Sequence, residues 1–443
     1  TPELVTYEPY FTSVEDLEDF LASLYLVDND WVDFENGEIV TFYGLEFAYG
    51  EKAFASIDAA VETAPEGATI IVMPGAYGED IIIDKPLTLL AANYNLNPAV
   101  DDEPFKADSD TAATITGVWA VNASNIKIKG FSFTGAARVK SYGPEVPAGF
   151  SNFRFENNYV YDTAEATIAW NESGHVTTGS SSADAAAPGF VSLYPTYTWL
   201  HNYQFINNKF SNVSDTHVFM VCVHNVTFKG NVFSGGDRDA IRLEYSANYG
   251  DFTFEDNVFE NIAYNGIYLR SYVGSPYASD LVANIYNNTF KNVGGAAATQ
   301  STERVRIGAI ATRGYGETWS AYFNIKFNHF EDCANYISLR DNVTNYETWS
   351  TKGLTWLAVI EYNAFIDGDG VEFYFANLLA PNDTEETNTG NALINHNFYG
   401  SDAETKVDIE PEQFDYHREE ESNTTVYETL AELLAAIEAL DEE

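Results

Sequence analysis

Hydrophobic and polar positions alternate along the chain in short runs that return many times. The recurring pattern reads apolar, any residue, apolar, two residues, asparagine, any residue, aromatic, as in YQFINNKF, VTFKGNVF and FTFEDNVF. Strict alternation over a few residues predicts a β-strand with one buried face. The asparagines of the eight copies are Asn158, Asn208, Asn231, Asn257, Asn288, Asn328, Asn363 and Asn397, and a ninth copy, IKIKGFSF, has Phe131 in their place.

The spacing of the copies predicts a solenoid. Asn208, Asn231 and Asn257 are 23 and 26 residues apart, which suits one coil of three short strands. Most copies are followed by a second apolar stretch, such as AIRLE, GIYLR, YISLR or VEFYF. Such short strands cannot bury both faces alone, so we expect the coils to stack in parallel around one continuous core.

The repeated asparagines favour a structural role over ligand contact. Asparagine tolerates the left-handed backbone region that a sharp corner needs. Its amide can also bond to the same side chain one coil away, as in ladders of stacked identical residues. We therefore expect the eight asparagines to form a ladder along one corner, with the aromatic residue two positions later stacked inside. Contact with a ligand is the alternative.

The segment before the repeats resembles the opening of right-handed parallel β-helix proteins of the pectin-lyase-like superfamily. Residues 54–95 contain TIIVMPGAYGEDIIIDKPLTLL, and residues 115–135 read ITGVWAVNASNIKIKGFSFTG. The matching positions include Pro74, Gly75, Tyr77, Lys85 and Pro86. The resemblance covers roughly residues 53–400 and implies an N-terminal helix that caps the solenoid. It is weak for function, because the family includes lyases, hydrolases, phage tailspikes and non-catalytic surface proteins.

The expected fold is all-β: a single right-handed parallel β-helix of about ten coils with amphipathic helices at the N- and C-terminal ends. Residues 1–52 form an N-terminal helical cap segment, 53–400 the β-helix, and 401–443 a tail with an amphipathic helix. A long insertion at 171–199 is a surface loop. Capping signals at Thr12/Ser13 and at Thr425 with Glu428 mark the two terminal helices. They either plug the solenoid ends or dock on a neighbouring molecule.

Charge changes the picture of possible partners. The chain has 67 acidic and 22 basic residues, a formal net charge of −45. Such a surface repels nucleic acid, anionic lipid and acidic polysaccharides, and it attracts divalent cations. No apolar run approaches the ~18 residues of a membrane span. We therefore expect no nucleic acid partner and no membrane span.

Other features point outside the cell. The chain begins with Thr1, which we interpret as a mature form after removal of a secretion signal. Cys222 and Cys333 are the only cysteines, so no disulfide framework is expected. Glycosylation sequons that suit a secreted or cell-surface glycoprotein occur at Asn122, Asn171, Asn212, Asn225, Asn287, Asn342, Asn382 and Asn423.

One stretch concentrates candidate chemistry. In FSGGDRDAIRLE, residues 233–244, Asp237, Asp239 and Arg242 are weak catalytic candidates. A glycoside hydrolase needs paired carboxylates, and a lyase needs a base with a metal or a cation. No recognisable set of either kind is present, so no catalytic residue is carried over from the family.

Alignment of the coils gives the same stretch a second interpretation. Glu244 and Arg270 share a column with Arg340, and Arg313 falls one position away; Arg238 and Arg242 lie nearby. Three hypotheses stay open for this charged face. It is a ladder of ion pairs, a contact with an acidic surface of another protomer, or a site for an acidic glycan.

Two smaller signals complete the candidate sites. Trp199 and Trp319 each lie nine residues before a repeat asparagine and could line one wall, which binds sugar rings or is buried under a loop or a partner. Asp367 and Asp369, in FIDGDGVEF, are weak candidates for calcium if a third carboxylate converges on them. No other cofactor is expected.

The leading hypothesis is an extracellular structural protein, a self-assembling subunit of a surface layer, sheath or filament. Acidity, the near absence of cysteine, the missing catalytic set and the two terminal helices favour it. The partner is then another copy of the chain, in a homo-oligomer or polymer. The alternative is a secreted polysaccharide lyase or hydrolase, or a non-catalytic protein of the pectin-lyase-like fold that binds cell-surface glycans.

Overall fold

The computed structural model describes most of the chain, with gaps at several loops and at both termini. The described residues are 13–108, 110–141, 150–164, 168–170, 200–221, 223–244, 250–270, 279–295, 307–313, 319–340, 355–366, 371–376, 389–399, 407–409, 415–417 and 429–440.

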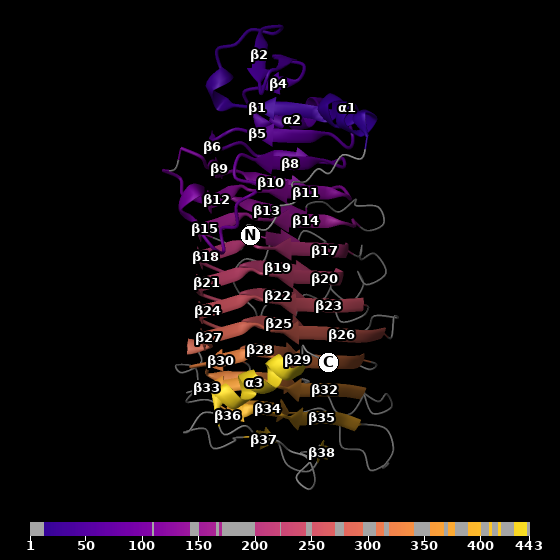
Figure 1. The fold of residues 1–443 in the computed structure, drawn as a ribbon, viewed down its shortest axis with the longest axis vertical. Helices are drawn as coiled ribbons and strands as arrows, with labels where there is room; N and C mark the ends of the chain where they lie inside the picture. The colour runs from indigo at the N-terminus through magenta and orange to yellow at the C-terminus, as the bar shows by residue number, and fades with distance from the viewer. Residues whose placement is uncertain are drawn as a thin grey trace, which may run out of the picture.

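Three parallel sheets run the length of the molecule and enclose one core (Figure 1). Each coil contributes one strand to each sheet, so that a strand pairs with the equivalent strands of the coils before and after it. We call the sheets 1, 2 and 3 in the order in which the chain passes through a coil. This arrangement confirms the expected parallel β-helix.

Sheet 1 has fourteen strands in the described part of the chain. They are β1 (Leu24–Val27), β4 (Ala53–Phe54), β5 (Thr69–Val72), β8 (Thr88–Ala91), β11 (Ile126–Lys129), β14 (Phe153–Glu156), β17 (Leu200–Ile206), β20 (Val223–Lys229), β23 (Gly250–Glu255), β26 (Ser279–Tyr286), β29 (Trp319–Lys326), β32 (Thr355–Glu361), β35 (Thr389–Asn395) and β38 (Asp415–His417).

Sheet 2 follows sheet 1 around a tight corner. Its described strands are β6 (Gly75–Tyr77), β9 (Ala113–Ile115), β12 (Ser132–Gly135), β15 (Tyr159–Thr163), β18 (Lys209–Val213), β21 (Val232–Gly236), β24 (Val258–Ile262), β27 (Thr289–Val293), β30 (His329–Glu331), β33 (Ala364–Ile366) and β36 (Phe398–Tyr399).

Sheet 3 closes each coil before the chain returns to sheet 1. Its described strands are β7 (Ile81–Ile83), β10 (Val118–Val121), β13 (Arg138–Ser141), β16 (Ile168–Trp170), β19 (Val218–Val221), β22 (Ile241–Glu244), β25 (Ile267–Arg270), β28 (Ile310–Arg313), β31 (Asn335–Arg340), β34 (Val371–Ala376) and β37 (Val407–Ile409).

The eight repeat asparagines lie together at the corner between sheets 1 and 2. From Asn158 to Asn363, each buried side-chain amide nitrogen donates to the amide oxygen of the asparagine one coil later, at 2.9–3.3 Å. The same oxygen accepts the backbone N–H of the earlier asparagine. Each amide nitrogen also donates to a strand carbonyl in the coil before, such as Phe205 for Asn231. The ladder therefore satisfies buried backbone groups as well as its own side chains.

The left-handed residue of the corner is not the ladder asparagine, as the sequence suggested, but the residue before it. Asn157, Asn207, Asp256 and Asn287 have φ between 51° and 58°. In later coils Phe327, Tyr362 and His396 take this position, with φ of 61°, 56° and 52°. The kink at this residue turns the chain, and the next asparagine is then free to keep a regular backbone and point along the ladder.

A column of stacked phenylalanine rings lines the inner face of sheet 2. Phe210, Phe233, Phe259, Phe290, Phe330 and Phe365, each two residues after a ladder asparagine, stack with ring centroids 4.7–5.1 Å apart. His217 packs nearly parallel to Phe210 and Phe233, at 6.1 and 5.8 Å. Its Nε2 lies 2.6 Å from the carbonyl oxygen of Gly235. His217 is thus part of the core.

The N-terminal segment contains more than the expected helical cap. Helix α1 (Val14–Ser23) begins after Ser13, whose side chain accepts the N–H of Asp16, and none of its residues is buried. β2 (Ile39–Phe42) and β3 (Leu45–Ala48) form an antiparallel hairpin, and η1 (Asn29–Trp31) precedes it. β1 pairs with β5, so the solenoid begins before residue 53. Helix α2 (Ile57–Thr63) buries Ile57, Ala60 and Val61 against the first strands.

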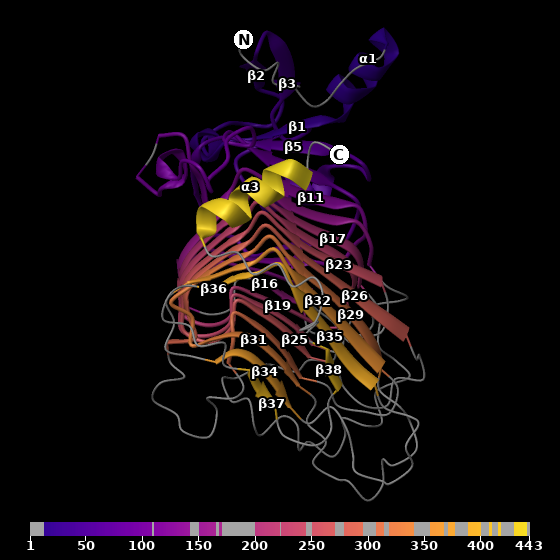
Figure 2. The same ribbon diagram turned by 60° about the horizontal axis from the view of Figure 1, so that its bottom comes forward.

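The C-terminal end also differs in detail. β37 and β38 extend sheets 3 and 1 past residue 400. Helix α3 (Leu430–Leu440) begins after Thr429, whose hydroxyl accepts the N–H of Glu432; the cap expected at Thr425 and Glu428 lies outside the described residues. Figures 1 and 2 place α3 beside the last coils and not beyond β37 and β38. Its Leu433 is buried.

No helix in the described residues is long and apolar enough to span a membrane.

Replacing Asn231 by alanine should lower the free energy of unfolding by about 1–3 kcal/mol. The change removes one buried amide and leaves the backbone N–H of Asn208 and the carbonyl of Phe205 without their partner. Chemical denaturation measures the loss. Asn324→Ala is the control, because Asn324 is half-buried on the outer face with one side-chain bond, to Asn284. Equal losses in the two variants would contradict a special role for the ladder.

His217 should make stability depend on pH. Burial lowers its pKa to about 4, whereas an unfolded histidine has a pKa of about 6.5. Between pH ~6.5 and pH ~4, therefore, His217 binds a proton in the unfolded chain and stays neutral in the folded one. The contribution is therefore complete above pH ~6.5 and is lost towards pH ~4, a loss on the order of 3 kcal/mol. His217→Phe keeps the aromatic stack and removes the titration. The free energy of unfolding of the wild type, minus that of the His217→Phe variant, should decrease as the pH is lowered from 7 to 4. A difference that stays constant over this range would contradict the assignment.

Candidate functional site

The charged stretch predicted from the sequence lies at the start of β22 and on the outer face of sheet 3. Ile241 and Leu243 are buried in the core, so Arg242 between them points outward. In the register of sheet 3, Phe219 lies opposite Arg242 in the coil before and Tyr268 in the coil after. Lys140 and Ala169 occupy the same position in earlier coils. An outward row thus combines cations and aromatic rings.

Arg242 is held by its neighbours in the row. Its guanidinium lies 5.5 Å from the ring centroid of Phe219 and 5.7 Å from that of Tyr268. Both distances are within the range of a cation–π interaction. Nη1 lies 3.9 Å from Oδ2 of Asp239, and the side chain is 15% exposed. The arrangement fixes the guanidinium between two rings with one edge near a carboxylate.

Asp239 has a structural role at the corner that leads into sheet 3. Its Oδ1 accepts the side-chain amide of Asn265 at 2.6 Å and the backbone N–H of Asn265 at 3.1 Å. Asn265 in turn accepts the N–H of Gly308. Burial raises the pKa of Asp239, against the lowering effect of Arg242 and Asn265. The carboxyl is 5% exposed, so a polymer on the surface cannot contact it directly.

The stretch begins within β21, and its residues Asp237 and Arg238 lie on the turn before β22. Asp237 is exposed, and Arg238 Nε lies 3.5 Å from Oδ1 of Asp215. Asp215 also accepts the backbone N–H of Thr216 at 2.8 Å. The two aspartates proposed as weak catalytic candidates therefore differ in environment. One is exposed on a turn and the other is buried in a corner network.

Two further cations on β13 extend the basic surface. Arg138 and Lys140 flank the buried Val139 and are half-buried on the outer face. Burial lowers the pKa of both side chains; Asp215 partly offsets this for Arg138, and Asp80 does so for Lys140. Sequence reasoning missed Arg138, Lys140, Phe219 and Tyr268. Alignment of the second strand of each coil, and not of the asparagine repeat alone, could have found them.

The predicted column of Glu244 and the arginines needs one correction. Glu244, Arg270 and Arg313 are direct register partners in β22, β25 and β28, so Arg313 is not displaced by one position. In the sequence, 16 residues separate β27 from β28 and four separate β24 from β25, so an alignment counted from the repeat asparagine crosses a longer segment before Arg313. Arg340 ends β31, which pairs with β28.

The other sequence candidates lie largely outside the described residues. Trp199, Asp367 and Asp369 are outside them. Trp319 begins β29 and pairs with Ser279 of the coil before. Within the described ranges, no group of three or more His, Cys, Asp or Glu side chains is placed to hold a metal ion. Calcium binding stays a prediction of the sequence.

Comparison with known proteins supports the fold and leaves the activity open. A family model described as a right-handed β-helix region matches residues 116–308. No curated protein sequence matches the chain. Two solved structures are similar. One is the catalytic unit of the GH87 alpha-1,3-glucanase from Streptomyces thermodiastaticus strain HF3-3, at 9% identity and a TM-score of 0.37, covering 84% of this chain and 67% of that one.

The other is a rhamnogalacturonan lyase, at 12% identity and a TM-score of 0.34, covering 91% of this chain and 89% of that one. Similarity at this level carries no information about substrate or chemistry. The family match and the three stacked sheets together establish that the chain carries a right-handed β-helix, as its resemblance to the pectin-lyase-like superfamily indicated.

Proposed function

We propose that the protein binds an acidic polysaccharide outside the cell, along the outer face of sheet 3, without cleaving it. The observation that carries the proposal is the gathering of Arg138, Lys140, Arg238 and Arg242 on this face of a chain whose net charge is −45. These are four of the 22 basic residues of the chain, and two of them, Lys140 and Arg242, share one register position of sheet 3.

The geometry of the row suits a linear polymer. Lys140 and Arg242 occupy the same register position three coils apart, roughly 14 Å at ~4.8 Å per coil. Tyr268 lies beside Arg242, is half-buried and offers ring surface to a sugar, whereas Phe219 on the other side of Arg242 is buried. Burial destabilises the charged forms of Arg138 and Lys140, and a bound carboxylate would offset that cost.

The overall negative charge does not prevent such binding at physiological salt. Charges farther apart than ~8 Å are largely screened there, so the nearby cations dominate the local interaction. Asp237 is exposed on the turn before β22, but hydrolysis needs a pair of carboxylates, and two neighbouring ones have structural partners. Asp239 is buried in its corner network, and Asp215 is bonded to Thr216 and paired with Arg238.

Polygalacturonate, a uronate polymer, should bind in 150 mM salt, and neutral dextran should not. Arg138→Gln with Lys140→Gln should weaken binding at least tenfold, about 1.4 kcal/mol, in isothermal titration calorimetry. Lys291→Gln is the control, because Lys291 is an exposed cation on sheet 2 paired with Glu331. Unchanged affinity in the double variant would refute the site. Release of reducing ends or unsaturated products by the wild type, abolished by Asp239→Asn, would establish cleavage instead.

A self-assembling structural subunit is the second candidate, favoured by apolar side chains at the N-terminal end. Val14, Val32, Ile39 and Tyr43 are 72%, 71%, 54% and 92% exposed. Exposed apolar groups that gather at one end are typical of contacts between molecules.

If these residues mediate assembly, Val32→Ser with Tyr43→Ser should shift sedimentation of the protein towards the monomer. Because both side chains are exposed, the variant should unfold at the same temperature as the wild type. A wild type that sediments as a monomer at every concentration tested would exclude this candidate.

A further inference from the structure

A long segment leaves the solenoid at the corner between sheets 1 and 2. Between β8 and β9 lie 21 residues, 92–112, whereas two residues join β11 to β12, β14 to β15 and β17 to β18 at the same corner. We call residues 92–108 the strap. It contains the short helix η2 (Glu103–Phe105). Because two residues are enough to turn the chain here, the additional residues need another explanation.

The strap is a folded unit whose two ends are tied to η2. The side-chain amide nitrogen of Asn93, which is 4% exposed, donates to the carbonyl oxygen of Pro104 at 2.6 Å. The same carbonyl accepts the hydroxyl of Thr111, two residues before β9, at 2.9 Å. These bonds hold η2 in a fixed position relative to the start and the end of the segment.

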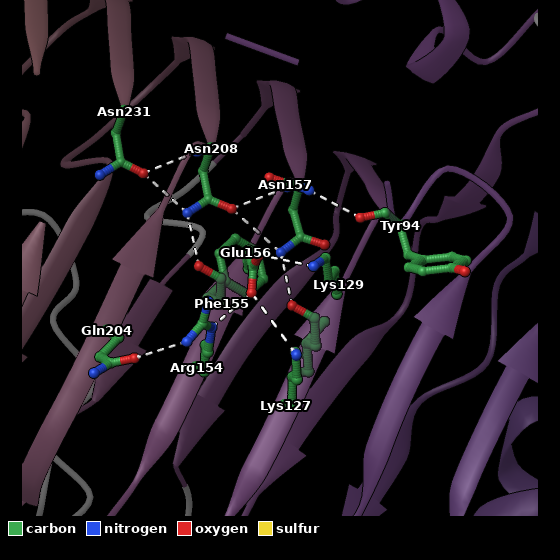
Figure 3. Close-up of polar contacts among 12 residues, drawn as sticks. Tyr94, Lys127, Lys129, Arg154, Phe155, Glu156, Asn157, Gln204, Asn208 and Asn231 are labelled. Atoms are coloured by element: carbon green, nitrogen blue, oxygen red, sulfur yellow. Dashed lines mark hydrogen bonds and ion pairs between the residues drawn. The ribbon is translucent and has the colours of Figure 1, made fainter. Parts of the chain in front are cut away.

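The strap packs on the outer face of sheet 2. The carbonyl oxygen of Tyr94 accepts the side-chain amide of Asn157, which lies directly before β15 in the ladder corner, at 2.8 Å (Figure 3). The hydroxyl of Ser132 on β12 donates to the carbonyl oxygen of Phe105, and both residues are fully buried. Phe105 therefore anchors the strap as a core residue would, although it lies outside the main core.

The tip of the strap reaches β18. Asp102 Oδ2 lies 2.7 Å from Lys209 Nζ, and the two residues are 107 positions apart. Lys209 Nζ also lies 5.8 Å from the ring centroid of Tyr159 on β15. Tyr159 points outward, because its neighbour Val160 is in the core, yet it is only 7% exposed. Burial raises the pKa of Tyr159 to about 12. The tip thus lies over β15 and pairs with β18, three strands and ~14 Å beyond β9.

This reach matters because a β-helix is held together mainly between neighbouring coils. Each strand of the three sheets pairs with the strand of the coil before it and of the coil after it. In such a molecule, stability is approximately a sum of terms for single coils and for their interfaces, and one part can open while another stays closed. The strap contacts residues of β12 and β18 at once, so it couples coils that are not neighbours.

The strap also crosses the coil interface that has the longest intervening chain in the ladder. Asn158 and Asn208, on the two sides of this interface, are 50 residues apart, whereas the other intervals of the ladder are 23 to 40 residues. The insertion at 171–199 accounts for the difference. The entropy lost in closing a loop grows with its length, so this interface is the costliest of the ladder to close. Tyr159 and Lys209 are register partners across it.

We propose that the strap is a clamp that makes β12, β15 and β18 open as one cooperative unit, and that it secures the interface interrupted by the insertion at 171–199. Asp102 precedes Lys209 by 107 residues, so the clamp closes only when the coil after the insertion is in place. The inference is independent of binding at sheet 3, because it uses other residues on another face.

Native-state hydrogen exchange of the full chain, followed by mass spectrometry, tests the clamp. In the wild type, peptides that cover β12, β15 and β18 should exchange with one common free energy of opening. Lys209→Met keeps an apolar side chain beside Tyr159 and removes the ion pair, so exchange of β15 and β18 should become at least threefold faster. Phe105→Ala removes the buried anchor and should make exchange of all three strands at least tenfold faster.

Lys291→Met is the matched control. Lys291 and Glu331 form an ion pair of the same length, 2.7 Å, on the outer face of the same sheet, but they lie in neighbouring coils. Exposed pairs of this kind contribute little to stability. The variant should leave exchange of β12, β15 and β18 unchanged and alter exchange of β27 and β30 less than twofold.

Three results would overturn the proposal. Faster exchange confined to residues 92–108 in both strap variants would mean that the strap packs on the sheet without coupling its strands. Clearly different free energies of opening for β15 and β18 in the wild type would mean that they are not one unit. An equal acceleration of β24 and β27 in the strap variants would mean a general loss of stability. Lys209→Met decides the outcome by itself if Phe105→Ala does not fold.

Discussion

The buried asparagine amides at one corner are the interaction on which the molecule depends. A tight turn between two sheets leaves backbone N–H and carbonyl groups in a place that water cannot reach, and unpaired groups there are costly. Each ladder amide satisfies such groups in its own neighbourhood and bonds to the next amide. Because every coil must meet this requirement at the same residue, the ladder fixes the register of all three sheets. The outward row on sheet 3 is aligned as a consequence.

Much of the fold could be predicted because each coil repeats the same short pattern of apolar, asparagine and aromatic residues. The positions of the eight asparagines and the aromatic column beside them follow from a pattern of eight residues. What could not be predicted depends on loop lengths and on long-range pairing. Arg313 was placed one position off because the alignment crossed the long stretch of sequence between β27 and β28. Phe327 and Tyr362 adopt the left-handed conformation although the sequence favours asparagine there, because the corner of the solenoid imposes it.

The candidate sites were harder to predict than the fold, for a physical reason. Lys140 and Arg242 are 102 residues apart, and only the coil register brings them into one row. The sequence drew attention to Asp239 and Arg242 because they are close along the chain. In the structure Asp239 stabilises a corner through Asn265, while Arg242 faces outward between two rings. Neighbours in sequence thus differ in role, and distant residues share one.

The asparagine ladder also has a direction. Every amide nitrogen from Asn158 to Asn363 donates to the asparagine of the coil that follows, and the backbone N–H of each does the same. A coil therefore completes its corner bonds only when its C-terminal neighbour has folded. During synthesis on a ribosome, each emerging coil would close the bonds of the one made before it. Folding in that order would leave only the last coil made with an incomplete corner.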